Sequence, residues 1–69
     1  MKLSARNVLK GKVVAVKKGV TTAHVKIKVG KGAVVTASIT MEAVKELKLK
    51  VGDRAAAIIK ASDVMVGKE

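Results

Sequence analysis

Two short segments near the ends of the chain each combine a hydroxyl, a cation and backbone N–H groups. Ser4–Asn7 (Ser-Ala-Arg-Asn) precedes a long alternating stretch, and Lys60–Ser62 (Lys-Ala-Ser) ends another. An arginine offers a charged, planar fork of donors, and successive free amides form a concave nest for an anion. Together Arg6 and Lys60 carry two positive charges, which match a dianion. Taken separately, each segment also fits a plain structural role, as a terminal stretch or a strand end.

Catalysis has little support in the residue types. His24 is the single histidine, it lies among lysines, and there is no cysteine. The carboxylates occupy expected helix and turn positions, and Asp63 directly after Ser62 is typical of a turn. We find no catalytic triad, no paired carboxylates and no spacing of cation ligands. The sequence therefore predicts a binding protein that is not an enzyme and holds no metal by direct cation coordination.

The formal net charge of +10 indicates a polyanion partner at first sight. Thirteen of the 15 basic residues are lysines, however, and they are spread over the chain with Lys17-Lys18 as the only adjacent pair. The chain has no aromatic residue, so it cannot stack bases as single-strand binders normally do. Binding of nucleic-acid backbones alone stays open as an alternative function. A further interpretation is that most lysines are solvated and maintain solubility.

The elements that position the two segments are expected to be mostly strands, because apolar and polar residues alternate. Gly11 predicts a bulge or bend early in the first strand, and Gly30–Gly32 predicts the turn of a hairpin. The first three strands are expected over Val8–Lys18, Thr22–Val29 and Ala33–Ile39.

After the third strand the apolar spacing becomes helical, which predicts a short helix over Met41–Leu47. Thr40 is its expected N-cap. Two further strands are expected over Arg54–Lys60 and Val64–Val66. The predicted fold is all-β with one short helix, in the order β-β-β-α-β-β, which is the order of an OB-like five-stranded barrel.

The 69 residues predict a single domain, 1–69, with a modest core. Without cysteine there can be no disulfide, and one histidine cannot support a structural zinc site. The apolar content of 49% comes from small aliphatic side chains, so we expect apolar surface to be shared between identical subunits. Met1–Asn7 carries charges where a signal peptide needs an apolar run, and no apolar stretch approaches a membrane span. These features predict a soluble intracellular protein.

The motifs resemble a known family over about Leu3 to Val66. They are the opening Ser4–Asn7, then Leu9–Val14, Lys17–Val20, Ser38–Thr40 and the closing Ile59–Val66. At this spacing and chain length the chain closely resembles the molbindins, which are small molybdate-binding proteins whose module also occurs in molybdate-responsive regulators and transporter ATPases.

The resemblance implies a cytoplasmic hexamer, a trimer of dimers, that serves molybdenum storage and homeostasis. Molybdate or tungstate is the implied ligand, with no organic cofactor, and the implied sites lie between subunits. One class of site would use the Ser4 hydroxyl, the amides of Ala5 and Arg6, and the Thr40 hydroxyl. Lys60, Ala61 and Ser62 would come from a neighbouring subunit. A second class of site, near the threefold axes, would lie by Lys18, Gly19 and Val20.

Overall fold

The computed structural model describes residues 3–69, and these form four strands, one α-helix and one 3-10 turn. Met1 and Lys2 lie outside the described residues. They begin the charged segment Met1–Asn7, which was predicted not to be a signal peptide. The strands are β1 (Asn7–Lys18), β2 (Thr22–Val29), β3 (Ala33–Thr40) and β4 (Arg54–Ile59), and the helical elements are α1 (Met41–Leu47) and η1 (Ala61–Asp63).

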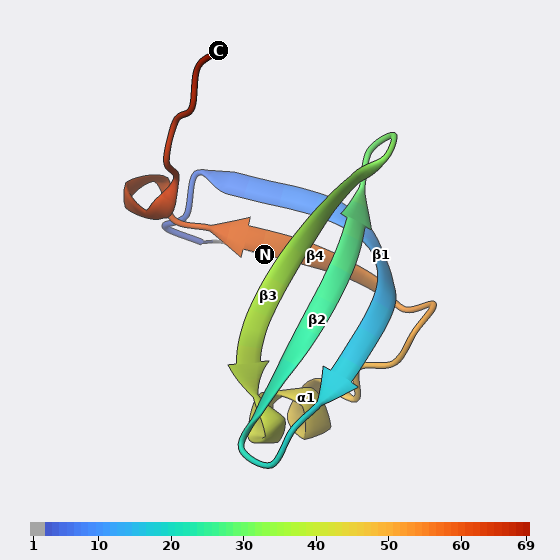
Figure 1. The fold of residues 1–69 in the computed structure, drawn as a ribbon. Coiled ribbons are helices and arrows are strands. Elements are labelled where there is room, and N and C mark those ends of the chain that lie inside the picture. The colour runs from blue at the N-terminus through green and yellow to red at the C-terminus, as the bar shows by residue number, and fades with distance from the viewer. Residues whose placement is uncertain (1–2) are drawn as a thin grey trace.

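The four strands form one antiparallel sheet in the order β3-β2-β1-β4. Figure 1 shows how the sheet curls: β1 bends in its middle, so that its first half and β4 cross over the hairpin of β2 and β3. The α1 helix lies at one end of this hairpin, and η1 lies beside the start of β1. The result is a half-barrel that is mostly β with one short helix, which confirms the coarse fold class.

The alternating residues of the strands divide the sheet into two faces. In β2 every second residue, from Ala23 to Val29, is buried, and the residues between them are exposed. We call the buried side the inner face and the opposite side the outer face. The core cluster on the inner face consists of Val13, Val25, Ile27, Val29 and Ala57. The period-two prediction for this strand is therefore confirmed in both its bounds and its orientation.

Of the two alternatives predicted at Gly11, a bulge or a bend, the bulge is not formed there. The register between β1 and β2 shifts between Val13 and Ala15, so the bulge lies at Val14. Gly11 is paired with Val29 and packs against it so closely that a Cβ would overlap the carbonyl oxygen of Lys28. The glycine is required because two backbones approach each other there, not because the strand gains a residue.

The α1 helix begins and ends where the helical spacing predicted. The Thr40 hydroxyl accepts a hydrogen bond from the backbone N–H of Ala43 at 3.1 Å, which confirms the N-cap. Lys48 follows the helix with a positive φ of 51°, and its N–H bonds to carbonyls of the last turn. Within residues 3–69, no helix combines the length and the apolar character of a membrane span.

The fifth strand expected over Val64–Val66 is not formed, so neither the closed five-stranded barrel nor its last strand is present in residues 3–69. Val64 has extended dihedral angles, but the chain leaves β4 through η1 and runs away from the sheet (Figure 1). Met65 and Val66 are more than nine-tenths exposed. An alternating apolar segment becomes a strand only when a neighbouring edge supplies hydrogen bonds, and within residues 3–69 this segment is paired with no strand of the sheet.

Candidate functional site

The start of β1 and the end of β4 bring the two oxyanion segments together. Asn7 is the register partner of Ile59, and its side-chain amide donates to the Ile59 carbonyl at 3.2 Å. The strands are antiparallel, so Ser4–Arg6 enters β1 at the point where Lys60–Ser62 leaves β4 (Figure 1). Segments more than 50 residues apart in sequence thus share one end of the sheet within a single chain.

The η1 turn leaves donors free at this end. The backbone N–H of Asp63 donates to the Lys60 carbonyl at 2.9 Å, and the backbone N–H of Val64 donates to the Ala61 carbonyl at 3.3 Å. Both donors come after Ser62, whereas the first amides of a helical turn have no carbonyl acceptor inside the turn. The amides of Ala61 and Ser62 therefore have no acceptor inside the turn itself.

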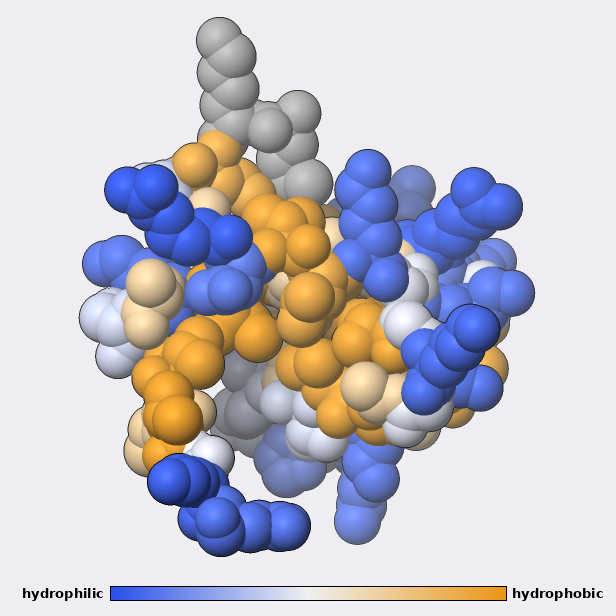
Figure 2. All heavy atoms as spheres, turned by 90° about the horizontal axis from the view of Figure 1, so that it is seen from above, coloured by the Kyte–Doolittle hydropathy of each residue, from blue (hydrophilic) through white to orange (hydrophobic). Residues whose placement is uncertain are grey.

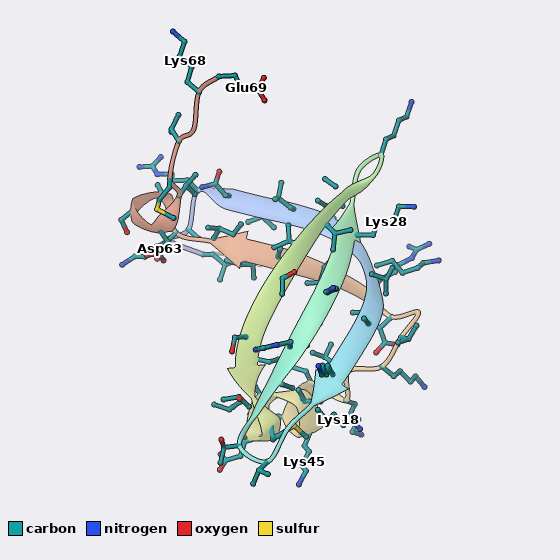
Figure 3. All side chains as sticks on the ribbon, in the orientation of Figure 1. Lys18, Lys28, Lys45, Asp63, Lys68 and Glu69 are labelled. Carbon is teal, nitrogen blue, oxygen red and sulfur yellow. The ribbon has the colours of Figure 1, made fainter. Side chains whose placement is uncertain are left out.

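The amino-terminal segment adds donors of a different kind. Ser4 and Arg6 are exposed, and Ala5 between them is half-buried against the fold. With Lys60, this end of the sheet presents two cations and two serine hydroxyls, against the one carboxylate of Asp63 in the turn, which Figure 3 labels. Such a set of charged forks, hydroxyls and amides suits an oxyanion that offers only acceptors.

Thr40 lies elsewhere in the single chain. It ends β3 opposite Thr22, at the far end of the sheet from the pair of Asn7 and Ile59. Its hydroxyl oxygen accepts from Ala43, which leaves the O–H free to donate to another group. The structure therefore does not bring Thr40 together with Ser4 or Lys60 inside one subunit.

The second predicted set, Lys18, Gly19 and Val20, lies in the turn from β1 to β2, at the same end of the sheet as Thr40. The backbone N–H of Met41, next to Thr40, donates to the Thr21 carbonyl at 2.9 Å, which ties this turn to the start of α1. The Gly19 N–H is used inside the turn, since it donates to the Thr22 carbonyl at 2.9 Å. Lys18 and Val20 are exposed, and the ammonium of Lys18 supplies the positive charge of this set.

Two features were missed when the sequence was considered alone. The first is an open apolar hollow of about 790 Å³ on the inner face. Its lining includes Val13, Val25, Ile39, Leu49 and Ile59. Seen from above, apolar surface lies exposed between hydrophilic side chains (Figure 2). The small aliphatic composition hinted at this hollow, because such side chains do not fill the space enclosed by a curled sheet.

The second missed feature is a set of aligned cations on the outer face. Lys12 of β1 lies directly between Lys28 of β2 and Arg54 of β4 in the register. Their alternation with apolar residues was visible in the sequence, but alignment across three strands depends on the register, which the bulge at Val14 alters.

Comparisons with known proteins agree with the geometry of the fold. The TOBE domain model matches residues 3–66. A probable molybdenum-pterin-binding protein of Haemophilus influenzae is 55% identical over 69 residues, which is the whole of both chains. Among solved structures, MopII from Clostridium pasteurianum in an apo form has a TM-score of 0.91 and 45% identity, covering 97% of this chain and 100% of that one.

A third relative was solved with its ligand. The cytoplasmic molybdate-binding protein ModG, with molybdate bound, superimposes with a TM-score of 0.91 and 45% identity, covering 94% of this chain and 46% of that one. The family model spans nearly all of the described chain, and the first relative matches from end to end. The chain therefore belongs to the TOBE domain family, and its predicted kinship with the small Mop-type molybdate-binding proteins is confirmed.

Proposed function

We propose that this protein is a cytoplasmic molybdate-binding protein that serves molybdenum storage and homeostasis. In this proposal residues 1–69 act as one binding domain without catalytic activity. The observation that carries it is the meeting of Ser4–Arg6 with Lys60–Ser62 at one end of the sheet. A similar chain, ModG, was solved with molybdate bound. Two of the relatives reported above are named for molybdenum or molybdate, so the nucleic-acid alternative is not favoured.

The proposed site holds one tetrahedral dianion. Arg6 and Lys60 balance its two charges, and serine hydroxyls and backbone amides supply short, directed hydrogen bonds. Thr40 reaches the site from another copy of the chain, because it lies at the opposite end of the sheet within its own. The complete proposed set is Ser4, Ala5, Arg6, Thr40, Lys60, Ala61 and Ser62.

The proposed assembly is a hexamer built as a trimer of dimers. When two copies join through the end that carries the site, a twofold axis makes the contact self-complementary. Because both segments lie at this same end of each chain, such a contact faces Ser4–Arg6 of one chain toward Lys60–Ser62 of the other, and each proposed site takes one segment from each chain. The open inner hollow and the exposed Val64–Val66 segment are apolar surfaces that association would cover. A second class of site, near the threefold axes, is assigned to Lys18, Gly19 and Val20.

Selectivity in this proposal follows from donors whose positions are fixed by the backbone. Sulfate is smaller than molybdate and cannot reach all donors at good length, and each unmet buried donor costs about 1–3 kcal/mol. Phosphate is partly protonated at neutral pH, and its hydroxyl would face a donor. Tungstate has nearly the size of molybdate and binds alike. The ligand is the inorganic anion alone, since the chain has no aromatic side chain to stack on a pterin ring.

Calorimetric titration tests the proposal directly. Molybdate and tungstate are expected to bind with dissociation constants below about 100 μM, and sulfate about tenfold or more weakly. Arg6→Ala and Lys60→Ala should each weaken molybdate binding severely, whereas Lys31→Ala, a turn lysine, should not. Parent-like binding by both Arg6→Ala and Lys60→Ala would mean that the site has been misplaced.

Mixing the two defective variants tests whether subunits share the site. In a dimer of one Arg6→Ala chain and one Lys60→Ala chain, a shared arrangement leaves one site intact and the other doubly defective. An arrangement inside one chain leaves both sites defective. We expect native mass spectrometry of purified mixed assemblies to show about half of the parent's anions at these sites, within hexamers. If the mixed assemblies regain no bound anion, the sites are not shared between subunits. That result would leave molybdate binding itself unaffected.

A further inference from the structure

A line of cations crosses the outer face of the sheet. Lys12 in β1 is the register partner of Lys28 in β2 and of Arg54 in β4. All three side chains are exposed, and register partners point to the same side of a sheet, with Cβ atoms about 4.5–5.5 Å apart. We call Arg54, Lys12 and Lys28 the cation ridge. Three like charges thus stand side by side on three adjacent strands.

No acidic side chain within the sheet balances the ridge. The four strands hold seven Lys and Arg residues and no Asp or Glu. The nearest carboxylate in sequence, Asp53, lies in the turn before β4, where its Oδ2 accepts from the Lys50 amide at 3.0 Å. Like charges placed directly opposite each other destabilise a sheet. The ridge therefore carries an electrostatic cost that a bound anion would remove.

The surface beside the ridge has a shallow, open depression. A hollow of about 390 Å³ opens over β1 and β4, and its lining consists of Lys10, Gly11, Arg54, Ala55 and Ala56. Lys10 is the register partner of Ala56, so a long cationic side chain stands next to a short one that leaves room. The hollow thus has small residues between two cations, and the ridge adjoins it at Arg54.

The spacing of these cations identifies the kind of ligand. Lys10 and Lys12 lie two residues apart, about 7 Å along the strand, and the ridge spans two strand spacings, about 10 Å. A single dianion would neutralise only part of this set. A chain of linked phosphates carries more charges over a comparable length, and both the arginine fork and lysine ammonium groups bind phosphate oxygens. No aromatic residue is present to stack on a base.

We propose that the cation ridge, with Lys10 and the adjoining hollow, forms a second binding site on the outer face for the linked phosphates of a polyphosphate or nucleoside triphosphate. Its donors are exposed side chains, in contrast to the backbone amides proposed for molybdate. The site therefore selects a ligand by its charge and its length rather than by the radius of a single anion. Its position on the outer face separates it from the end of the sheet that holds Ser4–Arg6 and Lys60–Ser62.

The test is a titration of the full chain with inorganic tripolyphosphate at low salt, repeated with Lys12→Gln. Losing the central cation should weaken binding about tenfold, and the logarithm of the binding constant should fall linearly with the logarithm of the salt concentration. The matched control is Lys45→Gln, because Lys45 lies on α1, well away from Lys28 (Figure 3). The control should change binding less than about twofold. Saturating molybdate should leave tripolyphosphate binding unchanged.

Four results would overturn the proposal. They are no measurable tripolyphosphate binding, equal weakening by both substitutions, competition by molybdate, or binding of oligonucleotides with no binding of tripolyphosphate. Titration with ATP separates the two sources of linked phosphates: equal binding of ATP and tripolyphosphate indicates that phosphates alone are read. Molybdate titration of Lys12→Gln should match the parent, so failure of this site is distinguishable from failure of the proposed molybdate function.

Discussion

The inner and outer faces of the same four strands have opposite chemical character: the inner face is apolar and the outer face is cationic. Alternate residues such as Val25 and Ile27 of β2 are buried on the inner face, whereas the intervening Lys26 and Lys28 are exposed on the outer face. The inner face stabilises the chain by removing apolar atoms from water. The outer face is cationic without balancing acids in the strands, which favours solubility and anion binding at some cost in stability. The residues that stabilise the fold and the residues that carry positive charge thus lie on opposite faces of a single sheet.

The inner face is also incomplete in a single chain. Val13 and Val25 have the largest fully buried side chains among residues 3–69, and the hollow beside them stays open. A core this small has little stability to spare, because a domain of this size is marginal to begin with. Substitutions on the inner face should therefore have large effects, and substitutions on the outer face small ones. The following predictions test that difference in decreasing order of effect.

Gly11→Ala should have the largest effect. A Cβ at this position would overlap the Lys28 carbonyl and come within 2.9 Å of Val29 Cγ1, so β1 and β2 would have to separate. We expect a loss of about 4 kcal/mol or more, enough to unfold most of the chain. Circular dichroism with thermal melting measures it, with Gly67→Ala as the control, because nothing lies within 4 Å of a Cβ built there. Similar melting of the two variants would contradict the close approach of the strands.

Val25→Ala should rank second. Val25 is 2% exposed at the centre of the inner face, and removing two methyl groups loses burial and leaves a cavity. The expected loss is about 2 kcal/mol in the free energy of unfolding, from chemical denaturation. Val34→Ala on β3, where the parent side chain is 51% exposed, is the matched control and should change stability by less than about 0.5 kcal/mol. Equal losses would show that the two faces do not differ as described.

The elements whose signals are local could be predicted from the sequence. The strict alternation in β2 and the helical spacing with Thr40 before Met41–Leu47 each depend on neighbouring residues, and the predicted bounds of both elements agree with the structure. The bulge at Val14 could not be predicted, since no residue type marks it. The Val64–Val66 strand was predicted wrongly because alternation reports a tendency to pair and says nothing about whether a partner edge exists.

The candidate site likewise has features that could be predicted from local sequence and features that could not. The chemistry of Ser4–Arg6 and Lys60–Ser62 was visible in their residue types. Their meeting depends on the pairing of Asn7 with Ile59, a contact across 52 positions that no local pattern specifies. The separation of Thr40 from this end likewise follows from strand order. The alignment of the cation ridge needs the register of three strands at once.

Thr40→Ala should have a moderate effect on stability. Its hydroxyl satisfies the Ala43 N–H at the start of α1, and loss of such a cap costs about 1 kcal/mol. Chemical denaturation should show this loss in the unliganded protein. Thr40→Ser keeps the hydroxyl and should recover most of the stability. If the serine variant were as unstable as the alanine variant, the methyl group rather than the cap would be the stabilising feature.

Lys12→Gln should have the smallest effect and the opposite sign. Glutamine keeps most of the side-chain length but removes the like-charge contacts with Lys28 and Arg54, so the unliganded protein should gain about 0.5 kcal/mol at low salt. Lys68→Gln, near the end of the tail (Figure 3), makes the same change in net charge away from the sheet and should gain less. At about 1 M salt the Debye length falls to about 3 Å, and the advantage of Lys12→Gln over Lys68→Gln should vanish. An advantage that persisted at high salt would have to come from packing, and the outer face would then carry no electrostatic cost for an anion to relieve.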